Sequence, residues 1–283
     1  MSAAMNPGIY HGISFEEYRA IDAVNISLLK VMRRSPLHYR HAATTKADPT
    51  DPMRLGTAAH CAVLEPDEFE GRFAVWGRKS EKTGNLCPRS GKYWDAFVDE
   101  SGGLEIISED HRDAAVGIAD IVRANSTAMR YLQTGAPEVT MIWDVMGVRC
   151  KGRADWITGD FLVGLKTTQD IRPFVFGARC ARLGYHLQWA FYHDGAEILT
   201  GSRKKLREIV IESAAPHDIA VYRITDDVIE QGRDDYRALL EQLIECRHGN
   251  DWPGTAPDGE IDVTLPSWAF PALDDISDLG LEA

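Results

Sequence analysis

Two charged residues on neighbouring predicted strands, Asp155 and Lys166, could carry chemistry. Residues 148–157 (VRCKGRADWI) and 161–168 (FLVGLKTT) have strand composition, and a turn separates them. Side chains alternate along a strand, so residues 164 and 166 share a face and Asp155 can lie beside them. Charged groups at this depth in a sheet are costly unless they are paired or bind a metal. A simple Asp155–Lys166 salt bridge is the alternative, and these two residues alone favour it.

Three polar residues on predicted helices could join this pair. His60 lies in LGTAAHCAVLEP, a helix whose small residues allow close packing. Gln188 and Tyr192, in YHLQWAFYHDG, are one helical turn apart and share a helix face. Each residue also has an ordinary structural explanation. A lone helical histidine is more often a core or surface residue than a ligand, and Gln188 and Tyr192 could form the polar rim of an amphipathic helix.

The elements that must position these residues alternate along the chain. The pattern predicts helices, then three strands, helices, two strands and a final helix, which indicates an α/β fold with a mixed central β-sheet flanked by helices. Residues 66–105, rich in glycine, proline and charge, predict a mobile excursion over the site. No linker is evident, so we expect a single domain over 1–283. The predicted strands are 138–145, 148–157, 161–168, 207–213 and 219–224; the predicted helices are 27–35, 55–64, 108–132, 173–199 with a break at Gly184, and 225–248.

The bulk composition narrows the class of protein. No apolar run approaches the ~18 residues of a membrane span, and the N-terminus lacks the basic and apolar segments of a signal peptide. Five cysteines without a CxxC pair predict free thiols in a reducing cytosol and no zinc site. The net charge of -12 argues against nucleic-acid binding unless basic residues are concentrated locally. We therefore expect a cytoplasmic protein.

Five short motifs follow one another along the chain: NISLLKVMRRSPLHYR, LGTAAHCAVLEP, CKGRADWI, GLKTTQD and GYHLQWAFY. Together they resemble the PD-(D/E)XK nuclease superfamily, in particular the exonuclease VIII (RecE-type) nuclease domain and its phage relatives. The resemblance runs from about Tyr10 to Trp268 and includes the tail segments DWPG and LPSWA. Each motif is weak alone, and the five in order are specific. The resemblance implies a restriction-endonuclease-like core over 55–224, preceded by a helical element over 1–54 and followed by a C-terminal helix and tail over 225–283.

The resemblance also implies roles for individual residues. His60, Asp155 and the backbone carbonyl of Leu165 would bind Mg²⁺, or Mn²⁺, which tolerates a histidine ligand better. Lys166 would orient or help deprotonate the attacking water and offset charge in the transition state. Gln188 and Tyr192 would position the nucleophile, the lysine or the DNA backbone. Glu138, at the start of the preceding strand, could support the ligands from behind.

The sequence departs from the family pattern at Gly164, where an Asp or Glu is expected two residues before the lysine. Asp160 shares the strand face but lies roughly 13 Å away, and Asp170 is six residues further on. Three explanations remain. The residue was changed deliberately to trap an inactive nuclease, the protein is a natural pseudo-nuclease, or a carboxylate from a distant segment completes the site. The first is preferred, because every other motif residue is intact, and it predicts an inactive or impaired enzyme.

The function implied by the resemblance is a 5′-to-3′ exonuclease that acts on double-stranded DNA ends. It would leave a 3′ tail for a phage-type single-strand annealing protein, and its relatives predict a homo-oligomeric ring around DNA, with no membrane partner. The alternatives are an endonuclease or a nuclease of other polarity, a non-catalytic DNA-binding module, and a structural or interaction protein with a buried Asp155–Lys166 salt bridge. The candidate phosphate contacts flank the first two motifs and are Arg33, Arg34, Arg40 and Arg54.

Overall fold

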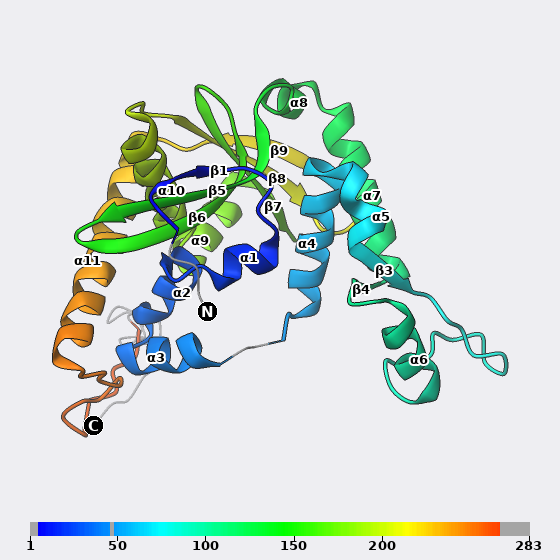
Figure 1. Cartoon of the computed structure of the whole chain (residues 1–283), viewed down its shortest axis with the longest axis horizontal. Coiled ribbons are helices and arrows are strands. Elements are labelled where there is room, and N and C mark those ends of the chain that lie inside the picture. The colour runs from blue at the N-terminus through cyan, green and yellow to red at the C-terminus, as the bar shows by residue number, and fades with distance from the viewer. Residues whose placement is uncertain (1–4, 46–47, 267–283) are drawn as a thin grey trace, which may run out of the picture.

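A seven-stranded mixed sheet forms the centre of the computed structural model, which describes residues 5–45 and 48–266 (Figure 1). Strands β5, β6 and β7 form an antiparallel meander, β7 and β8 pair in parallel, and β9 pairs antiparallel to β8. The predicted α/β fold with a mixed sheet is confirmed. The strands of this sheet are β1 (Gly8–Tyr10), β2 (Val24–Asn25), β5 (Ala136–Val145), β6 (Val148–Ile157), β7 (Phe161–Thr168), β8 (Lys205–Glu212) and β9 (Ile219–Arg223).

Helices cover both faces of the sheet and separate two hydrophobic cores. Alternation along β7 and β8 sends Leu162 and Leu206 to one core and Leu165 and Ile209 to the other. In Figure 1, α10 and α11 lie to the left of the sheet and α4 and α7 to the right. The helices of the first core are α2 (Ile26–Leu29), α3 (Pro36–Thr44), α9 (Pro173–Leu183), α10 (Tyr185–Thr200) and α11 (Asp226–Gly249); those of the second are α4 (Asp51–Leu64), α5 (Phe69–Arg72), α7 (Glu109–Ala124) and α8 (Ser126–Leu132).

Strands β6 and β7 separate just beyond the turn that joins them, and the resulting gap positions the site. Strands β6 and β7 pair only through Trp156 with Val163 and through Ile157 with Leu162. Beyond these pairs β7 continues in register with β8 along its whole length. Residue Asp155 therefore stands where the two strands begin to diverge, with its side chain available to the space between them.

Several predicted boundaries were wrong for local reasons. Asn25, not Ser27, caps the first short helix. The helical stretch ends at Arg33, as predicted close to Ser35 and Pro36. Ser35 in addition caps α3, because its hydroxyl accepts a hydrogen bond from the amide of His38. The helix predicted from 55 starts at Asp51. The helix predicted over 108–132 breaks at Asn125, whose side chain caps α8.

The excursion expected over 66–105 contains regular structure instead of a loop. It holds η2 (Pro66–Glu68), α5, β3 (Phe73–Trp76), α6 (Lys92–Glu100) and β4 (Glu105–Ser108), with β3 and β4 paired in parallel. The rings of Trp76, Trp94 and Phe97 pack against one another in edge-on and tilted arrangements and stabilise it. In Figure 1 much of this region projects from the right of the molecule instead of covering the central sheet.

Two further short elements complete the described chain: α1 (Phe15–Ala20) and η1 (Lys30–Arg33). No helix among the described residues is long and apolar enough to span a membrane. The end of the LPSWA motif, including Trp268, lies outside the described residues.

Candidate metal and catalytic centre

The carboxylate of Asp155 replaces the backbone pairing that stops between β6 and β7. Its Oδ2 accepts a hydrogen bond from the amide of Leu165 at 2.8 Å and lies 3.4 Å from Nζ of Lys166. Lys166 Nζ also donates to the carbonyl of Leu165 at 3.1 Å. The structure thus brings Asp155, Leu165 and Lys166 together at the point where the strands part.

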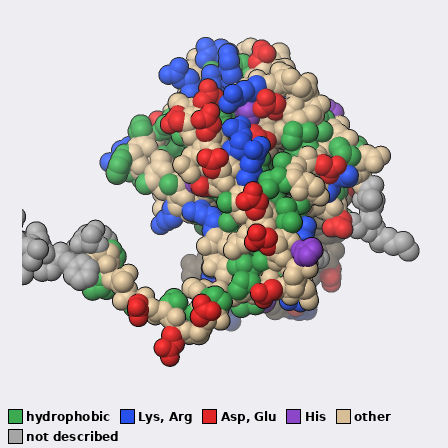
Figure 2. Space-filling view, turned by 90° about the vertical axis from the view of Figure 1, so that its left-hand side faces the viewer, with side chains coloured by type: hydrophobic (Ala, Val, Ile, Leu, Met, Phe, Trp, Pro, Cys, Tyr) green, Lys and Arg blue, Asp and Glu red, His purple; other side chains and the backbone are tan. Residues whose placement is uncertain are grey.

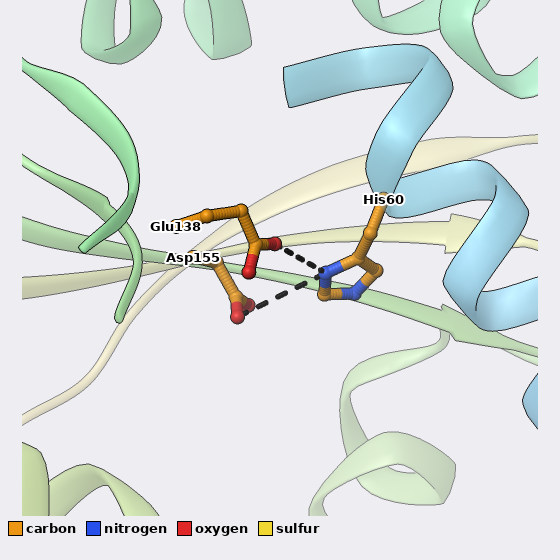
Figure 3. Close-up of side chains that lie close together, drawn as sticks. All are labelled: His60, Glu138 and Asp155. Atoms are coloured by element: carbon orange, nitrogen blue, oxygen red, sulfur yellow. Dashed lines mark ion pairs between the residues drawn. The ribbon is translucent and has the colours of Figure 1, made fainter. Parts of the chain in front are cut away.

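Three potential metal ligands converge beside this point (Figure 3). His60 Nδ1 lies 3.8 Å from Oδ1 of Asp155 and 3.9 Å from Oε1 of Glu138. The ligand atoms of the three residues all lie within 4.8 Å of one another. Helix α4 supplies the histidine, and its buried small residues Ala58 and Ala59 let it pack closely on the sheet. One imidazole nitrogen and two carboxylates form a donor set that fits Mg²⁺ or, better, Mn²⁺.

Glu138 is held in an unusual backbone conformation. Its φ is +48°, in the left-handed region that non-glycine residues rarely adopt. Arg153 Nε donates to Oε2 of Glu138 at 2.6 Å, which leaves Oε1 directed to His60. Such conformations persist where surrounding contacts enforce them, and they cluster at functional sites. The sequence suggested Glu138 only as a supporting group, whereas the structure places it among the candidate ligands.

Burial and ion pairing set the charges of the centre. Burial alone would raise the pKa of Asp155, but Lys166, His60 and the Leu165 amide together lower it. Burial alone would lower the pKa of Lys166, but the carboxylates of Asp155 and Glu208 raise it. Burial opposes protonation of His60, yet Asp155 and Glu138 outweigh it and raise its pKa. Asp155 is therefore ionised and Lys166 protonated at neutral pH.

Glu208, on the neighbouring strand β8, is a further buried carboxylate that the sequence interpretation missed. Only 1% of it is exposed. Its Oε2 accepts a hydrogen bond from Nε1 of Trp189 at 2.7 Å, and its Oε1 lies 3.3 Å from Nζ of Lys166. Burial, then the nearby Asp155 charge, raise the pKa of Glu208 above its usual value, although Lys166 opposes this. Lys166 thus lies between two carboxylates.

Gln188 and Tyr192 line a small cavity beside Asp155 and Lys166. Its volume is about 20 Å³, enough for roughly one water molecule. A hydrogen bond joins the side chains of Gln188 and Tyr192. Burial raises the pKa of the Tyr192 phenol to about 12. These two predicted residues therefore face the centre from α10. The cavity is also lined by Asp155, Gly164, Lys166 and Glu208.

The four candidate phosphate contacts differ in their environment. Arg33 donates to the carbonyls of Ala181 and Arg182 at the end of α9. Arg54 pairs with Asp51 at 3.4 Å, and Arg40 lies over the ring of Trp252. Arg34 is exposed. Three of the four thus have structural contacts, and Arg34 is the arginine best placed to meet a ligand from solvent.

The negative net charge is unevenly distributed over the surface. Figure 2 shows Lys and Arg side chains gathered at the top of one face, with acidic side chains among and below them and along the chain at lower left. Phosphate binding depends on such local concentration of positive charge and not on the net value. The net charge of -12 therefore does not exclude a nucleic-acid ligand.

A second group of possible ligands, His193, Asp194 and Glu197, has a structural explanation. Both oxygens of Asp194 are occupied by Arg233, at 2.8 to 3.0 Å, and Tyr236 donates to Oδ2 at 2.7 Å. This buried network ties α10 to α11. Its carboxylate has little capacity left for a metal.

Residues 25–263 match the family described as a PDDEXK-like domain of unknown function (DUF3799). The chain belongs to this family. The predicted membership of the PD-(D/E)XK superfamily is thereby confirmed, and the family and the fold together support a nuclease. The comparison with curated proteins finds no match.

The PDDEXK-like fold is also seen in a solved structure from Eubacterium rectale, a protein provisionally named as an exonuclease. The two chains are 14% identical, and the TM-score is 0.62. The alignment covers 95% of this chain and 99% of the other. At this identity the likeness establishes the shared fold, and the geometry of the site must support any statement about chemistry.

Proposed function

We propose that this protein is a metal-dependent exodeoxyribonuclease that degrades double-stranded DNA, in the 5′-to-3′ direction, from its ends. The observation that carries the proposal is the convergence of His60, Glu138 and Asp155 beside Lys166 in a PDDEXK-like sheet. When bound there, Mg²⁺ or Mn²⁺ would supply Lewis-acid polarisation of the scissile phosphodiester and make water a stronger acid. His60, Asp155, Glu138 and the carbonyl of Leu165 are the groups that would hold it.

Lys166 would act as a fixed positive charge. Burial would lower the pKa of Lys166, but the carboxylates of Asp155 and Glu208 raise it. A protonated amine beside the reacting phosphate stabilises negative charge that develops in the transition state. Gln188 and Tyr192, which line the cavity beside Lys166, would orient the water or the lysine.

The wider biological role follows from the same proposal. Degradation from 5′ ends leaves a single-stranded 3′ tail, the substrate of a phage-type annealing protein, in the cytoplasm of a bacterial or phage-infected cell. A homo-oligomeric ring around the duplex would give processivity and would require only its inner surface to be positive.

A linear duplex labelled separately at its 5′ and 3′ ends tests the activity and its direction. With Mg²⁺ or Mn²⁺ we expect early release of the 5′ label, no cleavage of a covalently closed circle, and no cleavage in the presence of a chelator. Cleavage of the circle would instead show an endonuclease. If linear DNA stays intact at every metal concentration, the proposed nuclease activity is refuted.

A non-catalytic DNA-binding protein is the second candidate, and Gly164 is the observation that favours it. If nothing replaces the carboxylate expected there, the protein would bind duplex DNA but cut it poorly or not at all. Absence of DNA binding even at low salt would favour a third reading, in which Asp155–Lys166 is only a buried salt bridge.

A further inference from the structure

Gly164 and Glu208 occupy the same register position on two parallel strands. The β7–β8 ladder pairs Gly164 with Glu208, between the pairs Val163–Arg207 and Leu165–Ile209. Paired residues of parallel strands direct their side chains to the same side of a sheet. Glu208 therefore projects from the face on which a side chain at position 164 would stand.

The Glu208 carboxylate fills the space that a side chain at 164 would enter. A Cβ atom built on Gly164 would lie 2.2 Å from Oε2 and 2.6 Å from Cδ of Glu208. Van der Waals contact between such atoms requires more than 3 Å. The glutamate has little room to move aside, since it is buried and held by Nε1 of Trp189. A glycine at 164 is thus a steric requirement of a glutamate at 208.

One oxygen of Glu208 faces the Lys166 ammonium, on a cavity that Asp155 also lines. Oε1 is buried and has no hydrogen-bond partner among the described residues, although the charge of Lys166 is 3.3 Å away. Glu208 lines the same cavity as Asp155, and Lys166 lies between the two carboxylates. Two buried carboxylates that share one ammonium are incompletely neutralised, and a divalent cation would compensate them.

We propose that Glu208 supplies the metal-binding carboxylate that is missing at position 164. The acidic group has moved from β7 to the facing position of β8, and its longer side chain reaches back over the glycine. This inference rests on the proposed function, because it assigns a residue to the same metal centre. With Glu208 as a ligand, a residue from a distant segment completes the site. The site is then not inactivated, contrary to the explanation preferred from the sequence.

The exchange of the two residues tests the proposal with metal binding as a readout independent of activity. The full-length chain and its variants would be titrated with Mn²⁺ in a calorimeter, and unfolding would be followed by circular dichroism. Glu208→Gln keeps the size of the side chain and an acceptor for Trp189 but removes the charge, and we expect Mn²⁺ affinity to fall about tenfold or more. Glu212→Gln, on the same strand, is the matched control and should bind as the wild type does.

The two-residue exchange gives the sharper result. Gly164→Asp alone should not improve Mn²⁺ binding and should lower stability, because its side chain collides with Glu208. Gly164→Asp combined with Glu208→Ala removes the collision and restores a carboxylate, so we expect its Mn²⁺ affinity to lie within a few-fold of wild type and well above that of Glu208→Ala. Such coupling between neighbouring residues is non-additive.

Two results would overturn the inference. One is a folded Glu208→Gln variant that binds Mn²⁺ as tightly as wild type. The other is a Gly164→Asp variant that binds Mn²⁺ more tightly than wild type while Glu208 is still present, which would mean that the native site lacks its second carboxylate. Wild-type protein that binds Mn²⁺ through Glu208 yet leaves all DNA intact would uphold the ligand assignment and refute the nuclease proposal.

Discussion

Asp155 and Leu165 are joined by a hydrogen bond from the Leu165 amide to the Asp155 carboxylate, 2.8 Å long, across the gap between β6 and β7. The side chain takes the place of a backbone acceptor where the ladder has ended. One oxygen of Asp155 thus closes the sheet, while Oδ1 faces His60. The geometry gives Asp155 a structural role and a proposed ligand role that different substitutions can separate.

Asp155→Asn should remove metal binding and cleavage while the fold is kept. The amide oxygen of the asparagine can still accept a hydrogen bond from the Leu165 amide. The negative charge that attracts the metal ion is lost. Asp155→Ala should in addition lose about 1–3 kcal/mol of stability, because the buried amide then has no acceptor. Mn²⁺ titration and urea unfolding of both variants check this. Equal stability of the two would show that the hydrogen bond to Leu165 contributes nothing.

Lys166→Met should destabilise the protein, and added metal should partly reverse the effect. Removal of the ammonium leaves Asp155 and Glu208 as uncompensated buried carboxylates, which costs about 3 kcal/mol. A divalent ion bound between these groups would stabilise the folded state by mass action. Cleavage should fall by roughly two to three orders of magnitude.

Melting curves with and without Mn²⁺ measure the loss of stability in Lys166→Met and its reversal by metal. Lys205→Met, at an exposed position on β8, is the control. A metal-induced shift no larger in Lys166→Met than in wild type would contradict the proposed position of the ion.

Asp194 should stabilise the protein in a pH-dependent way. Burial raises its pKa, but His193, Arg233 and Tyr236 outweigh burial and hold the pKa below the ordinary value of 3.8. As the pH falls, the unfolded chain takes up this proton first. The contribution of Asp194 is therefore complete above about pH 4 and is lost as the pH falls toward the lower folded pKa.

Asp194→Asn should cost about 3 kcal/mol at pH 7, since it leaves Arg233 without its buried partner. The difference in the free energy of unfolding between wild type and variant should shrink at pH 3. Urea unfolding at both pH values measures it, with the exposed Asp99→Asn as control. A difference that stays constant with pH would show that folding does not lower the pKa of Asp194.

The arginines near the first motif should separate into a structural and a DNA-binding residue. Arg33→Ala should lower stability by about 0.5–1 kcal/mol, because its guanidinium interacts with the carboxyl-terminal end of α9. Arg34→Ala should leave stability unchanged and lower the slope of log affinity against log salt by about 1. Fluorescence anisotropy with a labelled duplex between 50 and 200 mM salt, an interval suited to this measurement, decides between them. An unchanged slope would exclude Arg34 as a phosphate contact.

The local pattern of the sequence was sufficient for the strands that carry the centre. The predicted strands 148–157 and 161–168 coincide with β6 and β7, because composition and turn residues are local signals. The same stretches contain Asp155 and Lys166, and the motif order identified the superfamily before any coordinates. His60 could be nominated only through that resemblance, since a lone histidine on a helix has no distinctive spacing.

Only the tertiary structure revealed Glu208 and the place of Glu138. Glu208 stands 44 residues after Gly164 in the sequence, and the parallel pairing of β7 with β8 requires a crossover through α9 and α10 whose register no local pattern specifies. The place of Glu208 between Leu206 and Val210, apolar residues on the same face of the strand, was the one available signal. Local composition thus determined which strands form, while long-range register decided which carboxylates meet.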